Sequence, residues 1–273
     1  MTATPATGAP AAAPSGPGGV LVPLAFTTTA QTKLAATQLK LASRRLGVEG
    51  KPDAVAVFGP PGTGKSEIVA RTVQTLYADQ GAAVISLTLS ADIKPNELAT
   101  RILAALKAPT VGKGYVLRGD VVDLLRERRS VIVLAEAHHL QPRTWRDTKV
   151  VLDDLPQTDW IFIGHPDLLD SLEAVPEVRN RIGTWINVQP MSRHEVLTVL
   201  PQAHPLYAAA EPQLLAEVDA DHGHGTWRNW SHFTSKAAMT ADSLGVTTLN
   251  AQVARLALQA VGAPAPTRRR RTR

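Results

Sequence analysis

The chain has 273 residues, of which 44% are hydrophobic, so it is long enough for one sizeable domain and a smaller second one. It contains no cysteine, which excludes disulfides and thiolate metal sites. The formal net charge of +5 comes from five arginines in the last six residues, because the other 24 basic residues balance the 24 acidic ones. No apolar run reaches the roughly 20 residues of a membrane helix. We expect a cytoplasmic protein with no membrane partner.

The two ends of the chain differ in composition from the part between them. Residues 1–19 carry no charged side chain and almost no large apolar one, so they cannot bury enough surface to offset the entropy of ordering. Residues 263–273 combine prolines with adjacent arginines that repel one another. We predict a disordered leader over 1–19 and a disordered basic tail over 263–273.

Helical and strand-like patterns alternate through the first part of the folded region. Small and apolar residues at helical spacing predict a helix over 29–46. Short apolar runs suit buried parallel strands, and helical stretches separate most of them. The predicted strands are 54–59, 82–89, 130–135, 160–164 and 184–188, and the predicted helices between them include 95–107, 119–128 and 142–155. This pattern predicts an α/β fold with a five-stranded parallel sheet covered by helices on both faces.

Beyond residue 188 only helical patterns remain. They cover 192–200, 211–220, 227–244 and 248–261. We therefore predict an α/β domain over 20–190 and a small all-helical domain over 191–262.

The segment "FGPPGTGKS" follows the first predicted strand and matches the phosphate-loop pattern GxxxxGK[ST]. Its glycines let backbone N–H groups surround phosphate oxygens, Lys65 reaches the β and γ phosphates, and Ser66 offers its hydroxyl to Mg²⁺. The spacing differs from that of a dinucleotide-binding site. We predict ATP as cofactor, with Mg²⁺ on Ser66. The predicted nucleotide-binding residues of this loop are Gly59, Pro60, Pro61, Gly62, Thr63, Gly64, Lys65 and Ser66.

With "VIVLAEAHHL" at 131–140 and a helical domain after the sheet, the sequence resembles the P-loop AAA+ ATPases over about residues 50–235. Among them, its size and the segments "EAHHL" and "IGHPDL" are most similar to the DNA-transposition regulators of the phage Mu B, TnsC and TniB type. Secretion ATPases of the ExeA type are nearly as similar.

The resemblance implies three catalytic positions. Glu136 corresponds to the general base that orients the attacking water, and Arg181 to the arginine finger that completes a neighbouring subunit's site. Arg228 corresponds to the lid arginine that contacts the γ phosphate. Each role fits a reaction catalysed mainly by positioning and charge neutralisation. Two alternatives stay open: Arg179 in place of Arg181, and an Arg228 that only stacks on a neighbouring tryptophan.

The histidines have weaker assignments. His165 follows the fourth strand, where AAA+ ATPases have a small polar sensor of the γ phosphate. It either hydrogen-bonds phosphate or water, or is an ordinary turn residue before Pro166. The pairs His138 with His139 and His222 with His224 lack a nearby cysteine or a fixed carboxylate spacing, so they are poor metal-ligand sets.

One position departs from the AAA+ pattern. Ala135 stands where the third strand should end in the aspartate that holds Mg²⁺. Either another carboxylate or water completes the metal shell, with Glu136 the nearest candidate, or Mg²⁺ is held weakly and turnover falls while ATP still binds. We favour the second outcome, because phosphate contacts from Lys65 and the backbone do not depend on that aspartate.

A DNA partner is implied chiefly by the resemblance. Basic residues in segments expected at loops or helix starts suit contact with phosphates without sequence readout. They are Lys94, Lys113, Arg118, Arg143 and Arg146, with the arginines of the tail as a further contact. Taken alone, these residues would be ordinary solvated charges.

Three functional hypotheses follow. The first is an ATP-dependent regulator that assembles on double-stranded DNA as a homo-oligomeric ring or filament and recruits a transposase. The second is an ExeA-type ATPase that acts on a protein or envelope assembly without DNA. The third is a scaffold with a vestigial nucleotide site.

Overall fold

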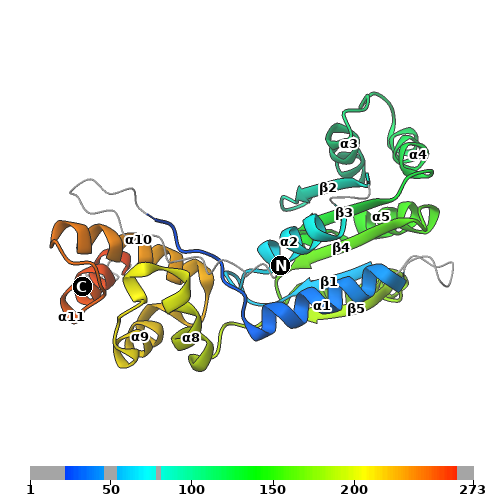
Figure 1. The fold of residues 1–273 in the computed structure, drawn as a ribbon. Helices are drawn as coiled ribbons and strands as arrows, with labels where there is room; N and C mark the ends of the chain where they lie inside the picture. Colours follow the sequence, from blue (N-terminus) through cyan, green and yellow to red (C-terminus); the bar gives the residue numbers. More distant parts are fainter. Residues whose placement is uncertain (1–21, 46–53, 78–80, 263–273) are drawn as a thin grey trace, which may run out of the picture.

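The computed structural model describes residues 22–45, 54–77 and 81–262, and every structural statement below refers to these residues. The predicted leader over 1–19 and the predicted tail over 263–273 lie outside them. Within the described residues, no helix combines the length and apolarity needed to cross a membrane. Two parts are visible in Figure 1: a sheet with its covering helices, and a smaller group of helices to its left.

The predicted five-stranded parallel sheet is confirmed. Its strands lie in the order β2-β3-β4-β1-β5, and all paired strands are parallel, so their carboxyl ends meet at one edge. The observed strands begin and end within two residues of the predicted ones. They are β1 (Ala54–Phe58), β2 (Ala83–Thr88), β3 (Ser130–Ala135), β4 (Thr158–Gly164) and β5 (Ile182–Asn187).

Helices cover both faces of the sheet. On one face lie α1 (Ala30–Arg45) and α2 (Lys65–Tyr77), and on the other α3 (Pro95–Ala105), α4 (Gly114–Leu125), α5 (Pro142–Asp154), α6 (Leu168–Glu173) and α7 (Pro176–Arg179). Alternate residues of a strand point to opposite faces. Val131 and Val133 therefore pack with α1 and α2, whereas Ile132 and Leu134 join the larger core under α3 to α7. Burial on both sides explains the continuous apolar runs.

The structure corrects one boundary. The stretch before residue 119, predicted as a basic loop, is largely helical, because α4 begins at Gly114. Glycine costs a helix about 1 kcal/mol relative to alanine, but Leu117, Val121 and Leu125 lie one turn apart and are buried. Burial of this stripe outweighs the glycines, so Arg118 lies on a helix.

A second core lies in the part formed by residues after 190. It is built from α8 (Arg193–Ala203), α9 (Pro212–Val218), α10 (Trp227–Ser243) and α11 (Ala251–Val261), with short turns at Pro205–Tyr207 and Asp219–Gly223. Side-chain caps fix where three of these helices begin: Ser192 caps α8, Thr226 caps α10 and Asn250 caps α11. We call this part the lid.

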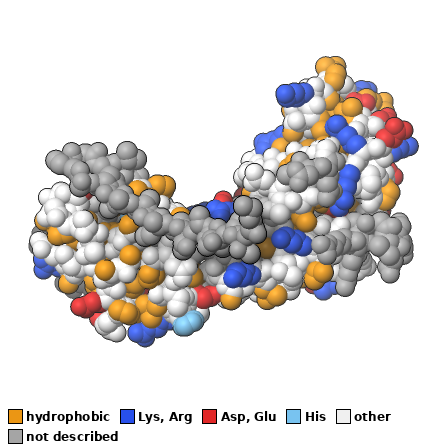
Figure 2. Space-filling view, in the orientation of Figure 1, with side chains coloured by type: hydrophobic (Ala, Val, Ile, Leu, Met, Phe, Trp, Pro, Cys, Tyr) orange, Lys and Arg blue, Asp and Glu red, His pale blue; other side chains and the backbone are white. Residues whose placement is uncertain are grey.

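Residues 22–29 form an extended segment between the lid and the sheet. The backbone N–H of Ala25 donates to the carbonyl of Ala203 at 3.1 Å, and a ring nitrogen of His204 lies 2.9 Å from the carbonyl oxygen of Val22. Arg71 on α2 donates to the carbonyl of Phe26 at 3.3 Å. This segment therefore contacts both parts of the molecule, and Figure 2 shows the surface hollowed between them.

Candidate nucleotide-binding site

The phosphate loop connects the carboxyl end of β1 to the first turn of α2. Gly59, Gly62 and Gly64 have φ values of 147°, 78° and 91°, which side chains rarely allow. A Cβ on Gly59 would lie 2.1 Å from the carbonyl oxygen of Val188, and one on Gly62 would lie 2.8 Å from the Cβ of Arg228. Glycine is therefore required here both by the backbone angles and by the close neighbours.

Lys65 crosses the loop. Its Nζ donates to the carbonyls of Gly59 at 2.8 Å and Pro60 at 2.7 Å, and the residue is 8% exposed. Burial lowers the pKa of Lys65; the charge of Glu136 opposes this shift and that of Arg228 adds to it. The ammonium group is thus directed along the inner side of the loop, where phosphate oxygens would lie.

A pocket of about 440 Å³ opens between the loop and the lid. This volume falls within the usual range for small-molecule sites. The pocket brings together the phosphate loop, the predicted base Glu136, the predicted sensor His165 and the predicted lid arginine Arg228. Its lining residues are Leu24, Phe26, Pro61, Gly62, Gly64, Lys65, Ser66, Glu67, Glu136, Ile163, His165, Trp227, Arg228, Ser231 and His232.

The lid contacts the loop directly. The backbone N–H of Arg228, in the first turn of α10, donates to the carbonyl of Gly62 at 3.3 Å. The alternative in which Arg228 stacks on a tryptophan is not found, because the cation–π pairs of the described residues involve other arginines, namely Arg71, Arg129 and Arg179.

Sequence reasoning missed an aromatic pair at this site. The rings of Phe26 and Trp227 are 4.8 Å apart, and both lie beside Gly64, where a Cβ would meet them at 2.5 Å and 3.2 Å. Phe26 lies ahead of the first helix, far from the loop in sequence, and an aromatic at the end of the apolar run "VLVPLAF" was the only signal. The pair forms an apolar wall beside the first turn of α2.

The ends of β3 and β4 supply the other side of the pocket. Glu136 follows β3 with φ 59°, a left-handed conformation uncommon for residues other than glycine. Its Oε2 lies 3.6 Å from Nε2 of His138 and 3.8 Å from Nε2 of His165. The Nδ1 of His138 accepts a long hydrogen bond of 3.4 Å from the backbone N–H of His165. Burial, aided by His139, lowers the pKa of His138, which favours the neutral ring.

Ala135 ends β3 beside a second, larger pocket of about 630 Å³ between α2 and the strands β2 and β3. Ser66 lines the same pocket, and so does Glu67, whose carboxylate pairs with Arg71 at 2.6 Å. The Mg²⁺ expected for this fold would thus find the Ser66 hydroxyl and, at position 135, a methyl group in place of a carboxylate. The residues present fit that ion only in part.

Arg181 lies at the opposite edge of the sheet from the phosphate loop. Its carbonyl accepts from the backbone N–H of Ala54 at the amino end of β1, whereas the loop follows the carboxyl end. A strand of five residues spans about 16 Å, so Arg181 does not reach the pocket of its own chain. Its Nε donates to Oδ1 of Asp153 at 2.7 Å. Partial burial of Asp153 is outweighed by hydrogen bonds from Arg181 and Lys149, and its pKa is lowered.

Arg179, the alternative candidate for the arginine finger, contacts other neighbours than Arg181 does. Its guanidinium pairs with Glu173 at 2.6 Å and lies 5.8 Å from the ring centre of Trp185. Both arginines are therefore in contact with neighbours of their own chain, and geometry alone does not choose between them.

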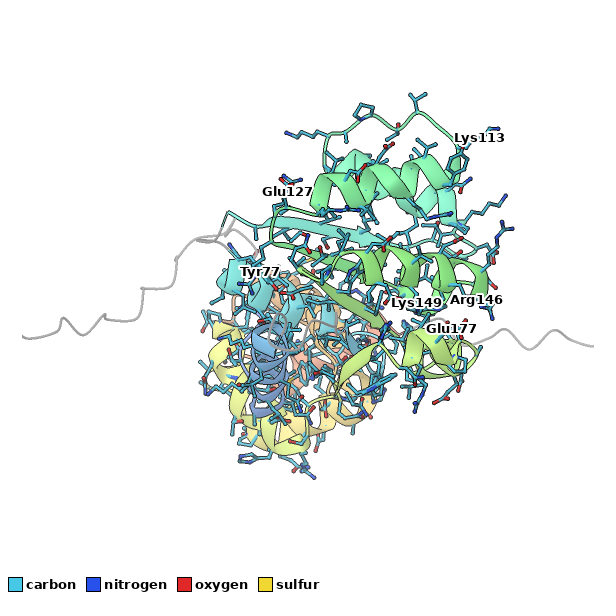
Figure 3. All side chains as sticks on the ribbon, turned by 90° about the vertical axis from the view of Figure 1, so that its right-hand side faces the viewer. Tyr77, Lys113, Glu127, Arg146, Lys149 and Glu177 are labelled. Carbon is cyan, nitrogen blue, oxygen red and sulfur yellow. The ribbon has the colours of Figure 1, made fainter. Side chains whose placement is uncertain are left out.

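The basic residues proposed for DNA divide into two groups. Arg118 pairs with Asp147 at 3.3 Å and Arg146 with Glu177 at 2.7 Å, whereas Lys94, Lys113 and Arg143 are exposed and make no ion pair with the described residues. Lys94 and Lys113 precede the first residues of α3 and α4 without capping them by a side-chain hydrogen bond, and Arg143 lies in the first turn of α5. Figure 3 shows Lys113 on the same side of the domain as Arg146 and Glu177, which lie close together.

Of the described histidines, only two join a carboxylate in a cluster with metal-ligand spacing. One ligand atom each from Glu136, His138 and His165 lies within 4.8 Å of the others. Among the described residues, His139, His222 and His224 join no such cluster. What the sequence could not indicate was that His138 would meet a histidine from a different strand.

Comparison with known proteins supports the fold. A family profile described as an AAA domain matches residues 48–172, slightly less than half of the chain. No curated protein is significantly similar to the chain in sequence. Several solved structures are similar in fold.

The Aeropyrum pernix ORC2 protein, in ADPNP and ADP complexes, matches with a TM-score of 0.68 and 19% identity over 87% of this chain and 69% of that one. Cdc6p from Pyrobaculum aerophilum matches with a TM-score of 0.67 and 17% identity, covering 80% and 64%. The Aeropyrum pernix ORC1 protein in complex with DNA matches with a TM-score of 0.64 and 18% identity, covering 85% and 64%. The chain thus has the predicted P-loop AAA+ fold with a helical lid.

Proposed function

We propose that the protein is an ATP-binding AAA+ regulator that assembles on double-stranded DNA when ATP is bound and hydrolyses ATP slowly. The observation that carries this proposal is the pocket of about 440 Å³ in which Lys65, Ser66, Glu136 and Arg228 line one cavity. Backbone N–H groups, a helix N-terminus, a lysine and an arginine together suit a triphosphate.

In the proposed complex the loop holds the β and γ phosphates, and Lys65 exchanges its bonds to the carbonyls of Gly59 and Pro60 for phosphate oxygens. Arg228 meets the γ phosphate from the lid, and His165 contacts it from the end of β4. We assign the adenine to the wall formed by Phe26 and Trp227, because aromatic rings stack on nucleobases.

Fewer groups contribute to hydrolysis than to phosphate binding. Glu136 orients the attacking water, and its carboxylate faces the pocket that also contains Lys65. When bound at Ser66, Mg²⁺ would neutralise charge on the β and γ phosphates. Position 135 adds no carboxylate to that ion, so we expect ATP affinity to be retained and turnover to be low.

Arg181 acts, in this proposal, on the ATP of a neighbouring copy. Its place at the amino end of the sheet, away from its own loop, supports action on a neighbouring subunit's site. The bond to Asp153 orients the guanidinium until a neighbour docks. A homo-oligomeric ring or filament follows from this assignment.

For DNA we propose contact through Lys94, Lys113 and Arg143, the exposed members of the basic set, with Arg118 and Arg146 at its margin. Figure 2 shows Lys and Arg side chains on the part formed by α3 and α4. One protein of similar fold, ORC1 of Aeropyrum pernix, was solved in complex with DNA. Recruitment of a transposase is the finer part of the proposal and rests on the resemblance of "EAHHL" and "IGHPDL" to transposition regulators.

One observation favours the second candidate, an ExeA-type ATPase without DNA: two of the five proposed DNA contacts are bound to carboxylates. Electron microscopy of the protein with duplex DNA, with ATP and with both separates the candidates. Rings or filaments that need both ligands support the DNA regulator, and assembly with ATP alone supports the ExeA-type role. ATP binding that is undetectable would leave only the scaffold with a vestigial site.

A further inference from the structure

The ends of the neighbouring strands β3 and β4 bring two imidazoles and a carboxylate together. Glu136 follows β3, His138 lies two residues later in the turn Ala137–His139, and His165 follows β4. The Oε2 of Glu136 is 3.6 Å from Nε2 of His138 and 3.8 Å from Nε2 of His165, and the three candidate ligand atoms lie within 4.8 Å of one another. From these residues we infer a binding site for a transition-metal ion of the Zn²⁺ type.

The distances suit such an ion. Zinc binds imidazole nitrogen and carboxylate oxygen at about 2.0–2.2 Å, so tetrahedral ligand atoms stand roughly 3.4 Å apart. The two distances from Glu136 exceed that value by only a few tenths of an ångström. All three ligand atoms lie within 4.8 Å of one another, so coordination requires the side chains to draw closer together.

The donor set selects the class of metal. Magnesium prefers oxygen ligands in an octahedral arrangement, whereas two imidazoles and one carboxylate suit Zn²⁺, Mn²⁺, Fe²⁺, Co²⁺ or Ni²⁺. The side chains of Glu136, His138 and His165 are 41%, 12% and 36% exposed, so an ion can enter and can keep an open coordination position. Since Glu136 and His165 line the nucleotide pocket, that open position faces the pocket.

Metal binding breaks one hydrogen bond of the cluster. The Nδ1 of His138 accepts from the backbone N–H of His165, so the neutral ring carries its proton on Nε2. Ligation through Nε2 moves that proton to Nδ1 and ends this contact. At 3.4 Å the hydrogen bond is long, and its loss is small beside the free energy of a metal–imidazole bond.

The inference has a functional consequence, which rests on the proposed function. A metal ion on Glu136 occupies the carboxylate that would orient the attacking water. The loaded protein therefore stays in its ATP-bound state, and the ion acts as an inhibitor of hydrolysis and not as a substitute for Mg²⁺.

The test measures metal binding by the untagged chain without nucleotide. Isothermal titration with Zn²⁺ and visible absorption spectra with Co²⁺ are the readouts. We expect one ion per chain, unaffected by millimolar Mg²⁺. His138→Ala and His165→Ala should each weaken binding at least tenfold, a loss that removal of even an outer-shell partner can produce. His139→Ala is the matched control and should bind as the unmodified chain does.

Absence of Zn²⁺ binding, or equal affinity in the His138→Ala, His165→Ala and His139→Ala variants, overturns the site. Thermal melting of each variant establishes that it is folded, and His138→Gln serves as a milder substitution if His138→Ala is not. Lys65→Ala, which should weaken ATP binding, should leave Zn²⁺ affinity unchanged. Failure of the nucleotide proposal and failure of the metal site therefore give different results.

Discussion

The phosphate loop and the ends of β3 and β4 face the same pocket, but they are held by different contacts. The loop is fixed by its backbone: three glycines at positive φ, carbonyls bound to Lys65, and a carbonyl bound to the lid. The ends of β3 and β4 instead contribute side chains: Ala135 offers no carboxylate, and Glu136 lies between two histidines. In the proposed function, phosphate binding and hydrolysis therefore depend on separate groups, and substitutions can test each one separately.

Glu136→Gln should separate hydrolysis from phosphate binding more strongly than any other substitution. A positioned base contributes about 100-fold or more to a rate, so the turnover of ATP should fall by about that factor while ATP affinity stays the same. Single-turnover hydrolysis and equilibrium nucleotide binding measure the two quantities separately. Glu67→Gln is the control, because that carboxylate also lines the pocket but is paired with Arg71. Equal losses in both variants would remove Glu136 from its assigned role.

Lys65→Ala tests the contribution of the phosphate loop to ATP binding. Loss of a hydrogen bond to a charged group costs about 1.5–3 kcal/mol, so ATP affinity should fall roughly 10- to 100-fold. Titration of a fluorescent ATP analogue measures the change, and Lys236→Ala, an exposed lysine on α10, should show none. If both variants bind alike, the loop does not hold phosphate in the assigned way.

Ala135→Asp tests whether hydrolysis is limited at the strand end. The pocket beside Ala135 is open, so the larger side chain fits without displacing its neighbours. A carboxylate facing Ser66 should strengthen Mg²⁺ binding and raise turnover about tenfold, since a metal ion can supply several kcal/mol of transition-state stabilisation. Steady-state hydrolysis against Mg²⁺ concentration is the measurement. A rate equal to that of the unmodified chain would contradict the role given to Ala135.

Phe26→Ala separates recognition of the base from recognition of phosphate. Stacking of a base on an aromatic ring contributes about 1–3 kcal/mol, and partial exposure of the pocket places the expected loss of ATP affinity at the lower end, about fivefold. Affinity for inorganic triphosphate, measured by competition, should be unchanged. A parallel loss for triphosphate would indicate a disturbed loop and not a lost stacking contact.

Asp159→Asn should leave the nucleotide site unaffected and serves as a test of the scaffold. Asp159 is buried at the amino end of β4, and burial raises its pKa to about 7 from a usual value of 3.8. The ionised form is disfavoured in the folded chain, so the carboxyl lowers stability progressively as pH rises from about 4 to about 7. The asparagine variant should therefore gain more stability at pH 8 than at pH 5, by thermal melting, with ATP affinity unchanged. An equal gain at both pH values contradicts the assigned cause.

Local patterns predicted most of the fold. The strands were predicted within two residues because burial on both faces makes them continuous apolar runs. The start of α4 was missed because Gly114 and Gly119 weigh against a helix locally, and only tertiary burial of Leu117 and Val121 decides it. Helices α6 and α7 are too short to produce a periodic signal.

Sequence patterns could indicate only the local parts of the candidate site. The phosphate loop is one contiguous motif, and Glu136 directly follows a strand. The cluster with His138 and His165 depends on β3 and β4 being neighbours, which the order of strands in the chain does not specify. The Phe26–Trp227 contact joins the segment before α1 to the start of α10, and no pattern within either segment indicates it.

The hydrogen bond between Arg228 and Gly62 gives the lid a mechanical role. Only residues 188–192 connect β5 to α8, and within them Met191 donates to the carbonyl of Gly225, close to the same point. The lid therefore contacts the phosphate loop at one end and ends at α11 at the other. In the proposed function, a shift of Gly62 on binding the terminal phosphate would be passed to the lid through this contact. An adjoining molecule could then respond to the nucleotide state without contacting the nucleotide.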